Sequence, residues 1–184
     1  MKERALRFSS FWVFPLLSIA LLTLSYRGQP HRFIADFAES LFIGLAFWTL
    51  LEYLFHRFLL HAEFHNTALR ALVNVSHARH HAAPRDRDQI LVKAPFALVT
   101  SALIYALLFA ITRDWFETSA IMSGIWLGFL YYEAVHYRVH ISLAHSNLLQ
   151  RQRRAHFHHH FSDSQKCFGV TTPMWDYVFG TMRR

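Results

Sequence analysis

Histidine is the residue type in this sequence that points most directly to chemistry. The chain contains 14 histidines among its 184 residues and a single cysteine, Cys167. Ten of the histidines gather in four short windows: His56 and His61; His77, His80 and His81; His136 and His140; and His156, His159 and His160. Imidazole nitrogen without thiolate is a ligand set that suits iron, zinc or copper. We therefore expect a nitrogen-rich metal site built from these ten residues.

The spacing within the windows predicts which histidines share an ion. On an α-helix, residues four apart lie about 40° apart around the axis, and residues three apart lie about 60° apart in the other direction. Three pairs have the four-residue spacing: His77 and His81, His136 and His140, and His156 and His160. His80 and His159 stand three residues after the first histidine of their windows, so these two windows can address two neighbouring metals. Ten ligands are too many for one ion, and two metals with about five nitrogens each are the simplest arrangement.

Other histidines near the windows fit this pattern less well. His56 and His61 are five residues apart, about 140° on an ideal helix, so they share a metal only if the helix breaks between them. His65 would pair with His61 at the four-residue spacing and stays an open alternative. His158 points roughly opposite to His156 and is predicted not to be a ligand.

Carboxylates close to the windows are candidates for orienting the imidazoles. Glu52 lies one helical turn before the first window, and Glu133 lies three residues before the third. A ligand histidine usually donates its other ring N–H to a carboxylate or a carbonyl, which fixes its tautomer. We expect Glu52 and Glu133 to have this role, with Asp163 and Asp176 as weaker candidates.

Long apolar segments precede the first histidine window and lie between the second and the third. Hydrophobic residues make up 53% of the chain and charged residues 17%, which excludes a disordered chain, and one cysteine cannot form an internal disulfide. Segments 8–26 and 94–112 are uncharged, and as helices each would be about 28 Å long, close to the hydrocarbon thickness of a bilayer. Segments 37–55 and 118–136 contain shorter uncharged runs that end at a carboxylate. We expect four membrane-spanning helices.

The basic residues predict the orientation of these helices. With four spans, 16 of the 19 Lys and Arg residues lie on the side of the two termini, which the positive-inside rule assigns to the cytoplasm. All ten candidate ligands then meet at the cytoplasmic membrane surface. His31 falls on the opposite side and His145 falls outside the spacing of the third window, so neither is a predicted ligand. The net charge of +7 comes without a nucleic-acid-binding motif, and no nucleic-acid partner is expected.

The chain as a whole predicts a single domain over residues 1–184. We expect an all-α integral membrane fold, with four transmembrane helices and a cytosolic helical cap that holds a histidine-rich dinuclear metal site. Two alternatives stay open for the apolar segments: a signal peptide at 8–26, and a soluble all-helical protein with buried hairpins. A histidine-rich surface without metal is the corresponding alternative for the windows.

A pair of nitrogen-bound metals at a bilayer surface favours one kind of chemistry. Open coordination positions for O2 beside a membrane suit oxidation of an unactivated C–H bond in a lipid. Zinc has no redox chemistry, so we expect two iron ions, although zinc can occupy the site in purified protein because it binds such ligands more tightly than Fe(II). A non-catalytic metal-binding membrane protein is the alternative from another functional class.

Five stretches of the sequence resemble the membrane fatty acid hydroxylase superfamily and, within it, the fatty acid 2-hydroxylase branch. They are Glu52–His61 (EYLFHRFLLH), His77–Asp86 (HARHHAAPRD), Tyr132–His140 (YEAVHYRVH), His156–Phe161 (HFHHHF) and Phe168–Thr181 (FGVTTPMWDYVFGT). The resemblance extends over residues 52–181, and its four ordered histidine boxes make it specific.

This resemblance implies four transmembrane helices, a cytosolic domain with a dinuclear metal centre, and ligand roles for the ten histidines. It also implies O2-dependent hydroxylation of the acyl chain of a membrane lipid, with carbon 2 as the expected position. Electrons would come from a separate donor, either cytochrome b5-like or ferredoxin-like. A sterol or carotenoid oxidase or desaturase is the alternative enzyme, because related histidine boxes serve those reactions.

Three features depart from the pattern of this branch. Glu133 stands where the branch usually has aspartate, and Ile141 follows His140 where a second histidine is common. Residues 1–7 leave no room for the N-terminal cytochrome b5-like domain of eukaryotic members. The compact chain therefore favours a multi-pass protein of the bacterial inner membrane, or of the endoplasmic reticulum if the source is eukaryotic.

Overall fold

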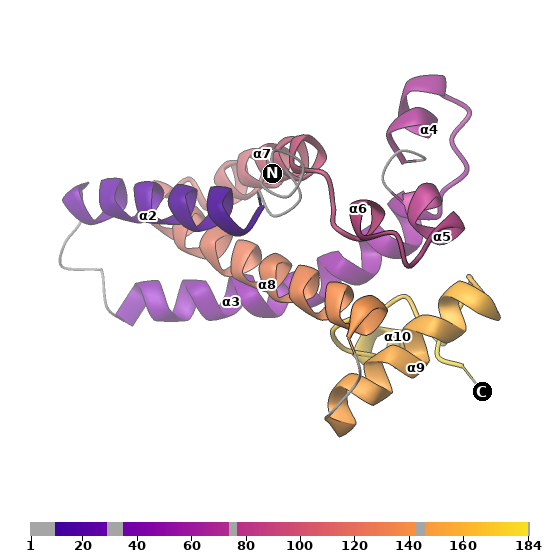
Figure 1. The fold of residues 1–184 in the computed structure, drawn as a ribbon. Helices are drawn as coiled ribbons and strands as arrows, with labels where there is room; N and C mark the ends of the chain where they lie inside the picture. Colours follow the sequence, from indigo (N-terminus) through magenta and orange to yellow (C-terminus); the bar gives the residue numbers. More distant parts are fainter. Residues whose placement is uncertain (1–9, 29–34, 74–76, 143–145, 184) are drawn as a thin grey trace. The chain divides into compact units, whose positions relative to one another are not determined.

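The structure of the protein is a computed structural model that describes residues 10–28, 35–73, 77–142 and 146–183. Within these ranges the chain forms helices and no strand (Figure 1). The elements are α2 (Ser10–Gly28), α3 (Ala35–Leu54), the π-helix η2 (Phe55–Leu60), α4 (Thr67–Val73), α5 (Arg79–Ala82), α6 (Arg87–Ile90), α7 (Ala94–Thr112), α8 (Trp115–Ile141), α9 (Asn147–Phe161) and α10 (Met174–Val178). The all-α fold class is thereby confirmed for the described residues. His31 and His145 lie outside them.

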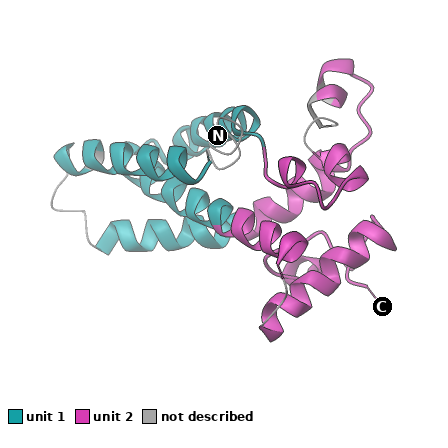
Figure 2. Cartoon of the chain, viewed as in Figure 1, with its two compact units in different colours: residues 1–48, 93–130 teal, residues 49–92, 131–184 magenta. Residues whose placement is uncertain are grey.

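The chain divides into two compact units (Figure 2). Unit 1 comprises Met1–Trp48 and Lys93–Leu130, and unit 2 comprises Thr49–Val92 and Tyr131–Arg184. Two helices, α3 and α8, begin in unit 1 and end in unit 2. The single domain expected over the whole chain stays a prediction.

The first half of α8 forms the core of unit 1. Most of its side chains between Thr118 and Phe129 are buried. Phe14 of α2 packs against Trp126 and Phe129, with ring centroids 5.4 Å apart in each pair. The Trp126 indole donates a hydrogen bond to Ser101 Oγ of α7 at 3.0 Å. Neighbouring helices therefore cover this part of α8. Because it is covered, it can contain buried hydroxyl side chains, which are less common on a helix that exposes an apolar surface.

Within unit 1, α3 and α8 approach each other closely at two glycines. A Cβ atom on Gly44 would lie 1.9 Å from the carbonyl oxygen of Ile121, and one on Gly124 would lie 2.1 Å from that of Leu41. These distances are far below van der Waals contact, so any side chain at either position would push the two helices apart.

Three helical segments are long and apolar enough to cross a membrane. They are Ser10–Gly28, Ala35–Leu60 and Arg87–Thr112. They correspond to the first three spans expected from the sequence, and large apolar side chains on them, such as Leu103 and Leu107, are exposed. The fourth expected span, 118–136, lies within the 27-residue α8, which is not among these three segments. A fourth span therefore stays a prediction.

Unit 2 contains the short helices and the ends of α3 and α8. Ser146 caps the start of α9, since its side-chain oxygen accepts from the backbone N–H of Leu149 at 3.2 Å. The buried residues of α9 are Leu149, Gln152, Ala155, His156 and His159. α9 therefore points His156 and His159, two residues of the fourth histidine window, toward the interior of unit 2.

Candidate metal centre

The ten histidines singled out from the sequence lie in two groups of five. The first group is His56, His61, His77, His81 and His159, and the second group is His80, His136, His140, His156 and His160. Within each group, one ring nitrogen of every histidine lies within 4.8 Å of those of the others. All ten residues belong to unit 2 and are buried or half-buried. Among the described residues, no other histidine joins either group.

The division into groups follows helix spacing. Each pair with the four-residue spacing falls in one group, whereas His80 and His159 each join the opposite group from the pair in their window. The rings of His81 and His160, one from each group, stack with centroids 4.2 Å apart. The two groups are therefore adjacent, which is the arrangement that a dinuclear site requires.

A π-helix brings His56 and His61 into the same group. α3 continues directly as η2, and His61 is the C-cap of η2 with a φ of −100°. A π-helix bonds each residue to the fifth along the chain, so residues five apart lie on nearly the same face. From the sequence, His56 and His61 are expected to share a metal only if the helix breaks between them. In the structure the helix does not break there but continues as the wider π-helix before it ends at His61.

The contacts of His156 show that the second group is not an ordinary hydrogen-bonded cluster. The Nε2 atom of His156 lies 2.8 Å from Nε2 of His140, 3.0 Å from Nε2 of His160 and 3.1 Å from Nε2 of His136. One imidazole nitrogen either donates a single hydrogen bond or accepts one. It cannot satisfy three such neighbours, whereas one cation among the four nitrogens would engage every lone pair.

The spacing of the nitrogens indicates how many ligands each ion would have. The close Nε2–Nε2 contacts in the two groups measure 2.8 to 3.2 Å. With metal–nitrogen bonds of about 2.1 Å, ligands at right angles lie about 3.0 Å apart and tetrahedral ligands about 3.4 Å apart. The shorter spacing favours more than four positions around each ion. Both groups therefore fit a five-nitrogen site better than a four-ligand structural zinc site.

Burial keeps these imidazoles neutral at physiological pH. It lowers the pKa of His61, His81 and His140 from the usual 6.5 to about 4. It lowers the pKa of His159 to about 3 and that of His80 to about 2. A neutral imidazole keeps the lone pair that a metal ion binds, so both groups present ligands in the required protonation state.

Backbone carbonyls fix the tautomers of two histidines in the first group. His56 Nδ1 donates to the carbonyl oxygen of Phe168 at 2.5 Å, and His159 Nδ1 donates to that of Lys166 at 2.8 Å. A proton on Nδ1 leaves the lone pair on Nε2, the nitrogen available to the metal. The segment 166–168, which precedes α10, therefore orients the rings of His56 in η2 and His159 in α9.

The carboxylates expected to orient the imidazoles have other partners. Glu52 Oε1 accepts from the backbone N–H of Val170 at 2.6 Å and of Thr171 at 2.8 Å, and Oε2 accepts from the Thr171 hydroxyl. Glu133 Oε1 accepts from the backbone N–H of Val92 at 3.1 Å. The expected role of Glu52 and Glu133 in orienting the imidazoles stays a prediction. Backbone N–H groups from distant parts of the sequence bind Oε1 of both carboxylates, whereas Glu133 Oε2 is buried without a hydrogen-bond partner in the described part of the chain.

Asp176, one of the weaker candidates, organises the segment before α10. Its carboxylate is fully buried and accepts from the backbone N–H groups of Phe168 at 2.9 Å and Gly169 at 2.8 Å. It also accepts from the Thr181 hydroxyl at 2.8 Å. Asp163, the other weaker candidate, accepts from a backbone N–H two residues further along. The stretch from residue 168 to 181 carries part of the family resemblance, but its sequence does not indicate that its backbone contacts His56.

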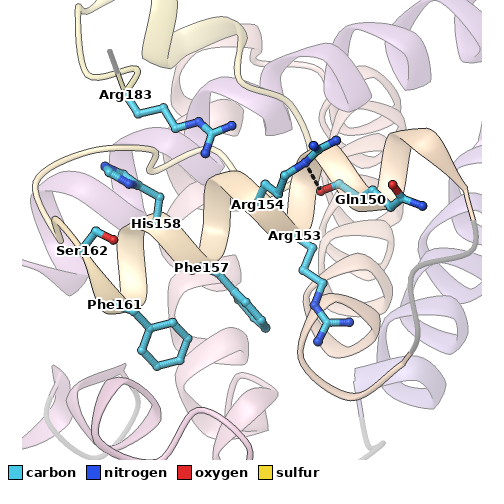
Figure 3. Close-up of a pocket in the computed structure, with 8 residues that line it drawn as sticks. All are labelled: Gln150, Arg153, Arg154, Phe157, His158, Phe161, Ser162 and Arg183. Atoms are coloured by element: carbon cyan, nitrogen blue, oxygen red, sulfur yellow. Dashed lines mark hydrogen bonds between the residues drawn. The ribbon is translucent and has the colours of Figure 1, made fainter.

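Two other histidines lie away from both groups. His65 is exposed and belongs to neither group. His158 lines a surface hollow of about 560 Å³ on α9 (Figure 3). The hollow is lined by Gln150, Arg153, Arg154, Phe157, His158, Phe161, Ser162 and Arg183. The outward position of His158 agrees with its expected exclusion from the ligand set.

A small cavity lies where residues of the two groups approach each other. Its volume is about 10 Å³, and it is lined by Leu60, His77, His80, Ile90, Leu91, Val92, Tyr132 and His136. This space is close to the minimum that holds one water-sized molecule. The aliphatic side chains in its wall would limit the access of bulk water to the histidines and leave room for a small reactant.

Comparisons with known proteins match the part of the chain that contains the ten histidines. The profile of the fatty acid hydroxylase family matches residues 41–181. The fatty acid 2-hydroxylase of Rattus norvegicus is 35% identical over 152 residues, which are 78% of this chain and 41% of the rat protein. Dihydroceramide fatty acyl 2-hydroxylase FAH2 of Arabidopsis thaliana is 26% identical over 174 residues, which are 94% of this chain and 73% of that protein.

A solved structure has the same fold. Full-length scs7p, in which only the hydroxylase domain is visible, superposes with a TM-score of 0.83 at 25% sequence identity. The match covers 97% of this chain and 67% of the solved chain. The chain thus spans about two fifths of the rat protein and a larger part of the visible hydroxylase domain.

Proposed function

This chain belongs to the fatty acid hydroxylase family, and from that membership we propose that it is an O2-dependent hydroxylase of the acyl chain of a membrane lipid. We propose carbon 2 as the position of hydroxylation, which is the position that the names of the rat and Arabidopsis relatives give for those proteins. The observation that carries the proposal is the pair of adjacent five-histidine groups in unit 2.

We assign the ten histidines as the ligands of two iron ions, one in each group. The converging Nε2 atoms, their separations of 2.8 to 3.2 Å and the neutral state of the buried rings support this assignment. Bound iron would supply the redox chemistry that activates O2. Zinc can occupy the same nitrogens in purified protein, but it has no redox chemistry and would leave the enzyme inactive.

The proposed reaction also defines what the protein must bind. One acyl C–H bond, one O2, two electrons and two protons give one C–OH group and one water. The two electrons come from a separate donor protein, cytochrome b5-like or ferredoxin-like. The side chains of Leu60, Ile90, Leu91 and Val92 provide an apolar wall beside the histidines, which supports an aliphatic substrate.

We further propose that the enzyme crosses the membrane four times, with both termini and the histidine groups on the cytoplasmic side. The three long apolar helices and the excess of Lys and Arg on one side of the expected spans support this arrangement. The bacterial inner membrane is the proposed location, or the endoplasmic reticulum if the source is eukaryotic.

Lipid analysis tests the proposed reaction. The full chain is produced in a host that lacks 2-hydroxy lipids, beside the variants His77→Ala and His158→Ala, and the acyl chains are released and identified by mass spectrometry. We expect 2-hydroxy acids with the unmodified chain and with His158→Ala, and none with His77→Ala.

Other outcomes of the same experiment separate the alternatives. Changes confined to sterols or carotenoids would contradict acyl hydroxylation and favour an oxidase or desaturase of those lipids. If iron-loaded protein with a reductant consumes no O2 with any lipid tested, the chain is a metal-binding protein without catalysis.

A further inference from the structure

The two histidine groups differ in how their rings are held. In the second group, the Nδ1 atom of every ring is buried and has no hydrogen-bond partner within the described part of the chain: His80, His136, His140, His156 and His160. In the first group, the Nδ1 atoms of His56 and His159 donate to backbone carbonyls. A ligand ring with such a partner is fixed in orientation and is a better electron donor to a metal.

Two buried carboxylates hold the segment that provides these carbonyls. Asp176 accepts from the N–H groups of residues 168 and 169, and Glu52 accepts from those of residues 170 and 171. Four successive N–H groups are therefore bound by carboxylates that come from α10 and from the end of α3. Hydrogen bonds from four successive N–H groups to two buried side chains give the segment a well-defined position.

Close packing also restricts this segment. A Cβ atom on Gly169 would lie 2.1 Å from the carbonyl oxygen of Thr172 and 2.9 Å from Asp176 Oδ2. The backbone of Cys167 has a φ of 57°, in the left-handed region, and its N–H donates to the carbonyl oxygen of Thr181 at 2.9 Å. This hydrogen bond and the two carboxylates fix the backbone whose carbonyls accept from His159 and His56.

We propose that Glu52 and Asp176 are positioning residues for the first histidine group, and that this group binds its metal ion more tightly than the second. The inference rests on the ligand roles given under the proposed function. Partners that orient ligand histidines typically change metal affinity by about 10- to 100-fold. The two ions therefore bind in order, with the first group filled at a metal concentration at least about tenfold lower.

A cobalt titration measures this order. The full chain in detergent is stripped of metal and titrated with Co²⁺ against a competing chelator, while visible absorption and bound metal are recorded. We expect two binding steps. His81→Ala, in the first group, weakens the tight step, and His160→Ala, in the second group, weakens only the other step.

The positioning residues are tested with Asp176→Asn, which keeps the shape of the side chain and removes its charge. We expect the tight step to weaken about 10- to 100-fold, with the second step unchanged. Asp163→Asn is the matched control, because Asp163 caps a nearby turn without holding residues 168–171, and it should change neither step. Far-UV circular dichroism of the metal-free proteins verifies that each variant is folded.

If Asp176→Asn does not fold, Thr171→Val provides the test. This change removes only the hydroxyl that donates to Glu52, and we expect it also to weaken the tight step alone. Equal affinities of the unmodified chain for both ions would overturn the inference and leave the proposed function intact. So would equal weakening of both steps by Asp176→Asn or by Thr171→Val. A chain that binds no cobalt would overturn both.

Discussion

Each imidazole of the two five-histidine groups offers one nitrogen atom to a metal ion. We expect His77→Ala and His160→Ala each to reduce bound metal from two ions towards one per chain and to abolish hydroxylation, because each variant removes one donor from one group. Metal analysis of the purified protein and mass spectrometry of the acyl chains measure the two effects. His158→Ala, on the outward side of α9, is the control and should preserve both. Equal loss in all three variants would contradict the assignment of helix faces.

Gly169 illustrates a residue whose importance comes from its lack of a side chain. We expect Gly169→Ala to lower the free energy of unfolding by about 1–3 kcal/mol, because the added Cβ atom overlaps the carbonyl oxygen of Thr172. Thermal unfolding in detergent, followed by circular dichroism, measures the loss. Gly28→Ala is the control, since a Cβ atom there meets nothing within 4 Å and should change stability by no more than about 1 kcal/mol. Equal midpoints of thermal unfolding for Gly169→Ala and Gly28→Ala would contradict the close packing around Gly169.

Eight of the ten histidines could be placed from the sequence because local helix spacing determines their relative positions; His56 and His61 are the exceptions. The four-residue pairs and the displaced His80 and His159 follow directly from 3.6 residues per turn. The partners of Glu52 could not be found in this way. Its hydrogen bonds reach Val170 and Thr171, more than a hundred residues along the chain, and only the folded chain brings them together.

At the scale of elements, η2 is the feature that local spacing does not reveal. A six-residue π-helix, Phe55–Leu60, replaces the last turns of an otherwise regular helix. Its composition resembles that of the apolar helix before it, so composition gives no indication of the change. The wider turn brings His56 and His61, five residues apart, into the same group.

The contact between α3 and α8 gives a prediction at the same scale. We expect Gly124→Ala to destabilise unit 1 by a few kcal/mol, because the added methyl would lie 2.1 Å from the carbonyl oxygen of Leu41 and force the helices apart. The apparent midpoint of thermal unfolding in detergent should fall. Ile43→Ala is the control: Ile43 is 46% exposed and should tolerate truncation with a smaller change. A larger loss for Ile43→Ala than for Gly124→Ala would contradict the importance of this contact.

For the whole molecule, hydropathy identifies three of the four expected membrane spans but not the span expected within α8. Three expected spans coincide with long apolar helices. α8 instead buries Thr118, Ser119 and Ser123 against its neighbours. A helix that other helices cover can be less apolar than one that faces lipid, so hydropathy alone indicates it less clearly.

Cysteine labelling tests the proposed orientation of the whole chain. In a Cys167→Ser background, we expect Arg113→Cys to react with a membrane-impermeant maleimide in intact bacterial spheroplasts, because the turn between α7 and α8 should face the outside. Arg151→Cys on α9 should react only after the membrane is permeabilised. Both arginines are exposed, so neither site is hidden by the fold. The reverse labelling pattern would contradict cytoplasmic termini.

The segment at residues 166–171 also has a consequence for biosynthesis. It supplies the carbonyls that accept from His56 and His159, and the ribosome makes it after every long apolar helix of the chain. The first five-histidine group can therefore take its final form only after all three long apolar helices have been synthesised. Under the proposed function, translation order thus delays metal binding by this group until nearly the whole chain has been made.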